Sequence, residues 1–111
     1  ASHRALKADA LSRTWLAGKA EVALWGAGET GKATADALAA AGVRTALFVE
    51  VDRKKVGRTV RGAPVVGWDQ LGRAKGLPLL VAVGAPGARD LIRAELGKAG
   101  WEEVRDFRCV A

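Results

Sequence analysis

The stretch that decides the fold is Glu21-Val22-Ala23-Leu24-Trp25-Gly26-Ala27-Gly28-Glu29-Thr30-Gly31-Lys32. A short apolar run ends at a G-x-G-x-x-G sequence, and an alanine-rich helical pattern follows at once. A strand, a tight turn and a helix in this order form a cradle for a phosphate group. The first glycine turns the chain off the strand, the second lets a pyrophosphate approach the backbone, and the third lets the helix lie close to the sheet. These positions are Gly26, Gly28 and Gly31.

An acidic residue ends the second apolar run of the chain. Glu50 lies 24 residues after Gly26, where an acid can accept hydrogen bonds from ribose hydroxyls. Asp52 is the alternative, since the ends of predicted strands vary by a few residues. Thr30 can cap the helix and donate a hydrogen bond to an anion. Glu29 favours a competing interpretation, a degenerate turn that only packs, because a carboxylate in the cradle repels pyrophosphate unless it points away.

The rest of the chain alternates strand and helix patterns. Helices are expected over 2–17, 30–41, 68–75 and 88–98, and strands over 21–25, 45–49, 79–83 and 106–110, with a short extended piece at 63–66. This order predicts an α/β fold, a Rossmann-like three-layer sandwich with a mostly parallel sheet of four or five strands. Residues 1–18 are expected to be a linker or N-terminal helix, and 19–111 the nucleotide-binding domain. The side chains expected in the core include Leu6, Leu11, Trp15, Leu16, Trp25, Trp68, Leu91, Ile92 and Leu96.

A second glycine-rich turn, Gly84-Ala85-Pro86-Gly87, follows the buried run at 79–83. That run is expected to pair beside 21–25, so Gly84 would lie near the first glycine turn, in the crevice where open parallel sheets bind ligands. Arg89 opens the next helix, and its guanidinium could reach a phosphate or ribose with a forked pair of hydrogen bonds. The alternative interpretation is that Arg89 is a solvated residue in the first turn of that helix and contacts no ligand.

The chain is basic, with 18 Lys and Arg against 12 Asp and Glu and a net charge of +6. Five of these cations fall between Arg53 and Arg61. They could neutralise a ribose 2′-phosphate or the phosphate of a sugar nucleotide, but a solvated loop is the favoured interpretation. No aromatic residue interrupts the run, so a nucleic-acid partner is not expected.

The residues for metal binding and nucleophilic catalysis are missing. With one His and one Cys, the 111 residues predict no metal site, no Ser-His-Asp set and no internal disulfide. Cys109 is expected to be inert, and no catalytic residue is assigned. The lack of a signal peptide and of a long apolar segment predicts a cytoplasmic location without a membrane span.

Three stretches also resemble known families when taken in order. They are Trp25 to Lys32, Phe48 to Arg58, and Arg61-Gly62-Ala63-Pro64-Val65-Val66. This order resembles the N-terminal nucleotide-binding domains of polysaccharide-biosynthesis acyltransferases and of epimerase/dehydratases. The end of the chain, from Val81 to Arg89 and from Asp106 to Ala111, resembles the C-terminal Rossmann-like domain of bacterial family 2 glycosyltransferases.

This resemblance implies a nucleotide- or nucleotide-sugar-binding accessory domain, with an upstream domain in the same parent chain. The parent would be a glycosyltransferase of polysaccharide biosynthesis, whereas this part would not itself be catalytic. Two alternatives stay open: an NAD(P)-binding fragment of an oxidoreductase, and a degenerate Rossmann scaffold without ligand. A homodimer is a further option for the partner. The expected ligand is therefore a nucleotide, a nucleotide sugar or NAD(P), with its identity open.

Overall fold

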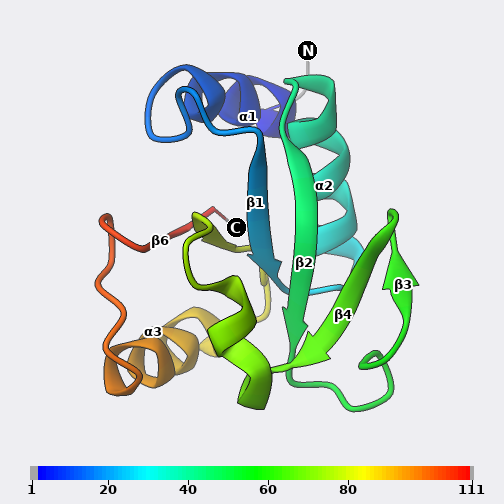
Figure 1. Ribbon diagram of the computed structural model, residues 1–111, viewed down its shortest axis with the longest axis vertical. Helices are drawn as coiled ribbons and strands as arrows, with labels where there is room; N and C mark the ends of the chain where they lie inside the picture. The colour runs from blue at the N-terminus through cyan, green and yellow to red at the C-terminus, as the bar shows by residue number, and fades with distance from the viewer. Residues whose placement is uncertain (1–2, 111) are drawn as a thin grey trace.

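The computed structural model describes residues 3–110, and within them one six-stranded sheet is covered by helices on both faces (Figure 1). The strands are β1 (Glu21–Trp25), β2 (Arg44–Glu50), β3 (Thr59–Val60), β4 (Ala63–Gly67), β5 (Leu79–Val81) and β6 (Phe107–Cys109). The helices are α1 (His3–Arg13), α2 (Glu29–Ala40), the 3-10 helix η1 (Trp68–Ala74) and α3 (Ala88–Lys98). The strand order is β3-β4-β2-β1-β5-β6.

All strand pairs are parallel except the hairpin of β3 and β4. Two residues with positive φ, Arg61 at 49° and Gly62 at 79°, form the turn of that hairpin. A two-residue turn of this kind matches the twist of paired strands. The mostly parallel sheet of an α/β fold is therefore confirmed, although it has six strands where four or five were expected. The additional strand, β3, has two residues and is too short to give a sequence pattern.

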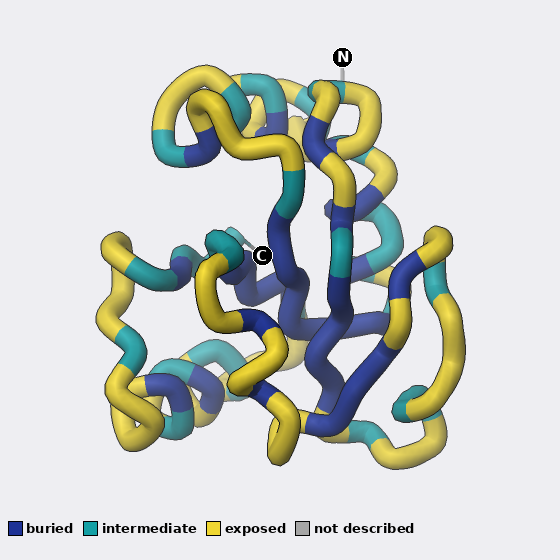
Figure 2. The backbone as a smooth tube through the Cα atoms, viewed as in Figure 1, coloured by how far each residue is buried: buried dark blue, intermediate teal, exposed yellow. Residues whose placement is uncertain are grey.

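The core lies in two layers because side chains alternate between the faces of each strand. On β1, Val22 and Leu24 belong to the cluster beneath α1 and α2, while Ala23 and Trp25 belong to the cluster beneath η1 and α3. The central strands are buried along most of their length, and exposure is concentrated in loops and outer helix faces (Figure 2). This arrangement confirms the three-layer sandwich, and it places the carboxyl ends of β1, β2 and β5 side by side.

Three apolar side chains expected in the core are exposed instead: Leu6 at 60%, Trp68 at 46% and Leu91 at 72%. In α3, Ile92 and Leu96 lie four residues apart and are buried against the sheet. Leu91 is one residue from Ile92, so it points about 100° away around the helix and faces outward. Trp68 begins η1 at the end of β4 and is not packed under the sheet.

Element boundaries shift by a few residues from those expected. The first helix ends at Arg13 rather than at 17, and turns follow it to Gly18; Ser2, its expected first residue, lies outside the described residues. The strand expected over 79–83 ends at Val81, although the Ala82 N–H still donates to the Trp25 carbonyl. Within residues 3–110, no helix has both the length and the apolar character needed to cross a bilayer.

Candidate functional site

The first glycine turn starts where β1 ends, near the middle of the sheet. Gly26 has a φ of 117°, and a Cβ there would lie 2.7 Å from the carbonyl oxygen of Ala82. A Cβ on Gly31 would overlap the carbonyl group of Gly26. Both positions therefore require glycine, and the first turn of α2 packs directly on the glycine turn.

The second glycine leaves the amino end of α2 open. Gly28 is the N-cap residue, and no side chain caps this helix end. A Cβ on Gly28 would meet one atom only, the Nζ of Lys55 at 3.2 Å. The amino end of a helix carries unpaired N–H groups and a partial positive charge, which suit an anion. Here a lysine ammonium lies beside them.

Glu50 holds the glycine turn to the end of β2. Its Oε1 accepts a hydrogen bond from the Ala27 N–H at 3.0 Å, and its Oε2 accepts from the N–H groups of Val51 and Asp52 at 2.9 and 3.0 Å. Glu50 is 7% exposed. A carboxylate offers about four acceptor positions, so one remains, on Oε1, where Lys55 Nζ lies 4.0 Å away.

Asp52, the alternative ribose acceptor, is half-buried beside this site. Its Oδ1 accepts a hydrogen bond from the Lys54 N–H at 3.0 Å, and its Oδ2 lies 3.8 Å from Lys55 Nζ. Lys55 therefore bridges two carboxylates at the mouth of the glycine turn. Both acids proposed as ribose acceptors lie within 4.0 Å of Lys55 Nζ, and each already accepts a hydrogen bond from a backbone N–H.

A cavity of about 170 Å³ opens between the glycine turn and the loop after β2. We call it the cradle cavity; it is lined by Ala27, Gly28, Glu29, Lys32, Lys55, Arg58 and Val60. Its ionisable side chains are three cations and one carboxylate, which favours an anion. The basic run is largely solvated, as expected, since Lys55 alone of its five cations is half-buried. Lys55 and Arg58 also line the cavity, whereas Arg61 pairs with Asp36.

The two glycine-rich turns lie together, as the sequence predicts. A Cβ on Gly84 would lie 3.5 Å from the Oγ1 of Thr30. Arg89 is half-buried on α3 and does not line the cradle cavity. The structure thus gathers the expected residues of the first turn, β2 and Gly84, while Arg89 stands apart from the cavity.

The described residues contain no group of three His, Cys, Asp or Glu side chains that could hold a metal ion. Cys109 at the end of β6 is half-buried, and burial raises the pKa of its thiol, with the charges of Arg93 and Arg89 opposing that rise. A raised pKa keeps the thiol protonated and weakly nucleophilic near neutral pH. Trp25 is buried in the core, as expected.

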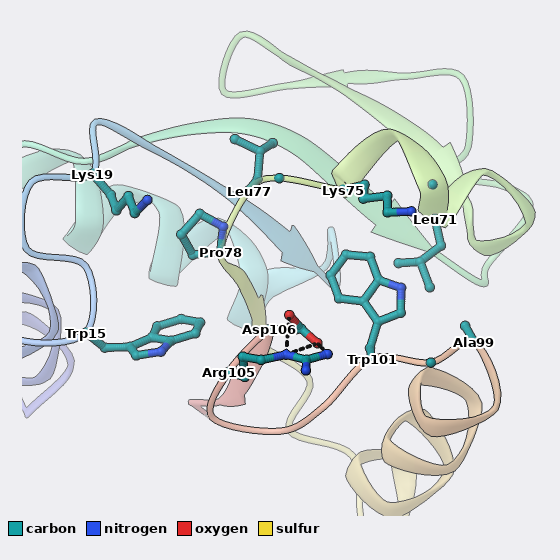
Figure 3. Close-up of a pocket in the computed structure, with 13 residues that line it drawn as sticks. Trp15, Lys19, Leu71, Lys75, Leu77, Pro78, Ala99, Trp101, Arg105 and Asp106 are labelled. Carbon is teal, nitrogen blue, oxygen red and sulfur yellow. Dashed lines mark hydrogen bonds and ion pairs between the residues drawn. The ribbon is translucent and has the colours of Figure 1, made fainter.

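A larger cavity, of about 600 Å³, lies at the opposite edge of the sheet, around the amino ends of β1, β5 and β6 (Figure 3). Ligands of open parallel sheets bind outside the carboxyl ends of the strands. The larger cavity is therefore separate from the glycine turn. The sequence did not predict this cavity, because its lining residues come from separate segments of the chain, between residues 15 and 106, that are adjacent only in the fold.

No protein-family model matches the chain, and no curated protein matches it either. Several solved structures do match the chain in fold. UDP-D-quinovosamine 4-dehydrogenase from Vibrio fischeri is 21% identical with a TM-score of 0.65, over 85% of this chain and 80% of that protein. RSP in complex with β-NADH is 16% identical with a TM-score of 0.58, over 82% of this chain and 53% of that one.

RSP, a Rex-family repressor, also matches in its complex with β-NAD⁺ and operator DNA, with 17% identity, a TM-score of 0.57, and coverage of 81% of this chain and 49% of that one. The chain thus spans about half the length of RSP. At these identities the likeness establishes a Rossmann-like fold. It lends no support to the family 2 glycosyltransferase resemblance. The operator DNA is bound by RSP, and the expectation that nucleic acid is no partner of this chain stays a prediction.

Proposed function

We propose that this domain binds a nucleotide ligand, with a phosphate group at the turn from Gly26 to Gly31. The observation that carries the proposal is the cradle cavity, where an uncapped helix end meets Lys32, Lys55 and Arg58. Backbone N–H groups at a helix start and cationic side chains together form a common phosphate site.

The proposed roles follow the geometry of each residue. Gly28 gives the phosphate access to the backbone, and Thr30 donates a hydrogen bond from the first turn of α2. Glu50 presents its remaining acceptor to a ribose hydroxyl once Lys55 turns toward the phosphate, and Asp52 is the second acceptor. Gly84 leaves room beside Thr30 for the ligand.

Arg89 is the weakest member of the proposed site. It does not line the cradle cavity, and it would reach the ligand only from the second glycine-rich turn, through the start of α3. An Arg89→Ala variant that binds nucleotide as the parent does would remove this residue from the site.

Calorimetric titration with nucleoside diphosphates, UDP-sugars, NAD and NADP tests the proposal and the ligand class together. The double variant Lys55→Gln/Arg58→Gln should bind the active ligand about tenfold to a hundredfold more weakly, because each residue supplies a charged hydrogen bond. Lys54→Gln is the matched control, since Lys54 is adjacent to Lys55 but does not line the cavity.

The outcomes separate the candidate functions. Binding of UDP-sugars alone would favour an accessory domain of sugar metabolism. Binding of NAD or NADP alone would favour the NAD(P)-binding fragment of an oxidoreductase; RSP in complex with β-NADH is a structural precedent for binding the dinucleotide, not for the reaction. No heat with any of these compounds would leave the degenerate scaffold. The glycosyltransferase parent rests on sequence resemblance, and the sequence of the full-length gene tests it directly.

A further inference from the structure

The larger cavity, which we call the amino-edge cavity, is formed by chain segments that enter the sheet. Lys19 precedes β1, Pro78 precedes β5, and Asp106 precedes β6. Its volume of about 600 Å³ lies within the range of small-molecule sites in proteins, roughly 300–1,000 Å³. It is far from the glycine turn along the strands, so a ligand here would not occupy the cradle cavity.

Two indole rings line the amino-edge cavity. Trp15 and Trp101 come from opposite ends of the chain and lie on either side of Arg105 and Asp106 in Figure 3. Both residues are half-buried, and both line the cavity. Leu77 and Pro78 add apolar surface next to them. Such surfaces suit the face of an aromatic ring.

Trp15 is fixed in place before any ligand arrives. Its indole N–H donates to the carbonyl of Val104 at 2.6 Å, and the guanidinium of Arg108 lies 5.0 Å from the centre of its ring. Trp15 lines the cavity and Arg108 does not, so this cation is not among the groups that a ligand in the cavity would meet. A ring held in this way loses little conformational entropy when a ligand packs on it.

The cations of the cavity are only partly neutralised. Arg105 pairs with Asp106 and Glu102. Lys19 and Lys75 form no ion pair within the described part of the chain, and no acceptor there takes the indole N–H of Trp101. With three cations and one carboxylate among its lining residues, the cavity carries a net positive charge.

We propose that the amino-edge cavity binds a small molecule with an aromatic ring and an anionic substituent. The molecule lies along the cavity with its aromatic surface against the indoles of Trp15 and Trp101, and its anion is held by Lys19 or Lys75. An uncharged aromatic molecule would contact the indoles but not the lysine charges, and a compact inorganic anion would contact the lysines but not the indoles. This inference does not rest on nucleotide binding at the glycine turn.

Fluorescence titration with two probes of one scaffold tests the proposal. The probes are 8-anilino-1-naphthalenesulfonate, which is anionic, and N-phenyl-1-naphthylamine, which lacks the sulfonate. The parent should bind the sulfonate more tightly. The variant Lys19→Gln/Lys75→Gln should bind the sulfonate about tenfold more weakly, since two exposed charges are lost, and should bind the neutral probe as before.

Controls address unfolding and binding elsewhere. Trp101→Ala should weaken both probes, and its circular dichroism and melting point show whether it folds. Two control variants change residues outside the cavity. Lys54→Gln removes a lysine charge and Trp68→Ala removes an exposed indole, and both variants should bind the two probes as the parent does. If the parent does not bind the sulfonate, or if the lysine variant binds it unchanged, or if the controls weaken it equally, the proposal is wrong.

Discussion

At the scale of single residues, Gly31 joins the glycine turn to α2 through a contact that no other residue allows. Because any Cβ there would overlap the Gly26 carbonyl, Gly31→Ala should lower the free energy of unfolding by about 1–3 kcal/mol. Urea denaturation measures the change. Gly97→Ala is the matched control: Gly97 lies in α3 with nothing near its Cβ position, and this variant should be neutral or up to about 1 kcal/mol more stable. Equal midpoints for both variants would show that the contact is absent in solution.

Glu50 gives a second prediction at this scale. An amide in place of the carboxylate keeps one acceptor oxygen, so at least one of the three backbone N–H groups on Glu50 loses its partner. Glu50→Gln should therefore destabilise the domain by about 1–3 kcal/mol. The same chemical unfolding experiment at neutral pH checks it. An unchanged stability would mean that the carboxylate faces solvent and is free for a ligand.

At the scale of elements, an ion pair fastens the β3–β4 hairpin to α2. Arg61 donates two hydrogen bonds to Asp36, at 2.7 and 3.1 Å, and this lowers the pKa of the Asp36 carboxyl. A lowered folded-state pKa gives stability that is present above the unfolded value, near 4, and is lost as pH falls through the folded value. Asp36→Asn should thus be less stable than the parent at pH 7, and the difference should shrink below about pH 4. A difference that stays constant with pH would contradict this account.

The loop between α3 and β6 contains a strained residue. Val104 has a φ of 76°, which is unfavourable for a β-branched side chain, and it is exposed. Val104→Gly relieves the strain while losing little buried surface, so it should raise the melting point, by the equivalent of about 0.5–1 kcal/mol. Calorimetry provides the measurement, and a lower melting point would mean that the valine side chain makes contacts that outweigh the strain.

Predictability from sequence also differs between elements. Helix α3 begins and ends where the sequence predicts. Ile92 and Leu96 give a clear helical period, and Gly87 and Gly100 mark the two ends of the helix. The sequence predicted that Glu50 and Gly84 lie near the glycine turn, because the strand order fixes which strand ends are neighbours. The approach of Lys55 to Gly28 depends on how the loop after β2 folds back. The amino-edge cavity brings Trp15 and Trp101, from opposite ends of the chain, to the same cavity, and neither residue has a local sequence pattern that predicts this.

At the scale of the whole molecule, the N-terminal segment joins both ends of the described chain. The side chains of Ala8 and Leu16 lie in the core with Leu38 of α2. The Lys7 ammonium donates to the Val110 carbonyl, while Trp15 donates to the loop before β6. A segment held at these points is expected to fold together with the sheet. Of the two expectations for residues 1–18, a linker or an N-terminal helix, these contacts therefore favour a helix that folds with the domain.

Leu16 provides the test. Its side chain is 1% exposed, so Leu16→Ala should lower the free energy of unfolding by about 2–5 kcal/mol through lost burial and a cavity. Leu6→Ala is the matched control, because Leu6 is largely exposed on the same segment and its truncation should change stability by about 0.5 kcal/mol or less. Urea unfolding should remain a single transition in both variants, since the segment shares one core with the strands. If Leu16→Ala leaves the midpoint unchanged, or if a separate early transition appears, residues 1–18 are a linker that folds apart from the domain.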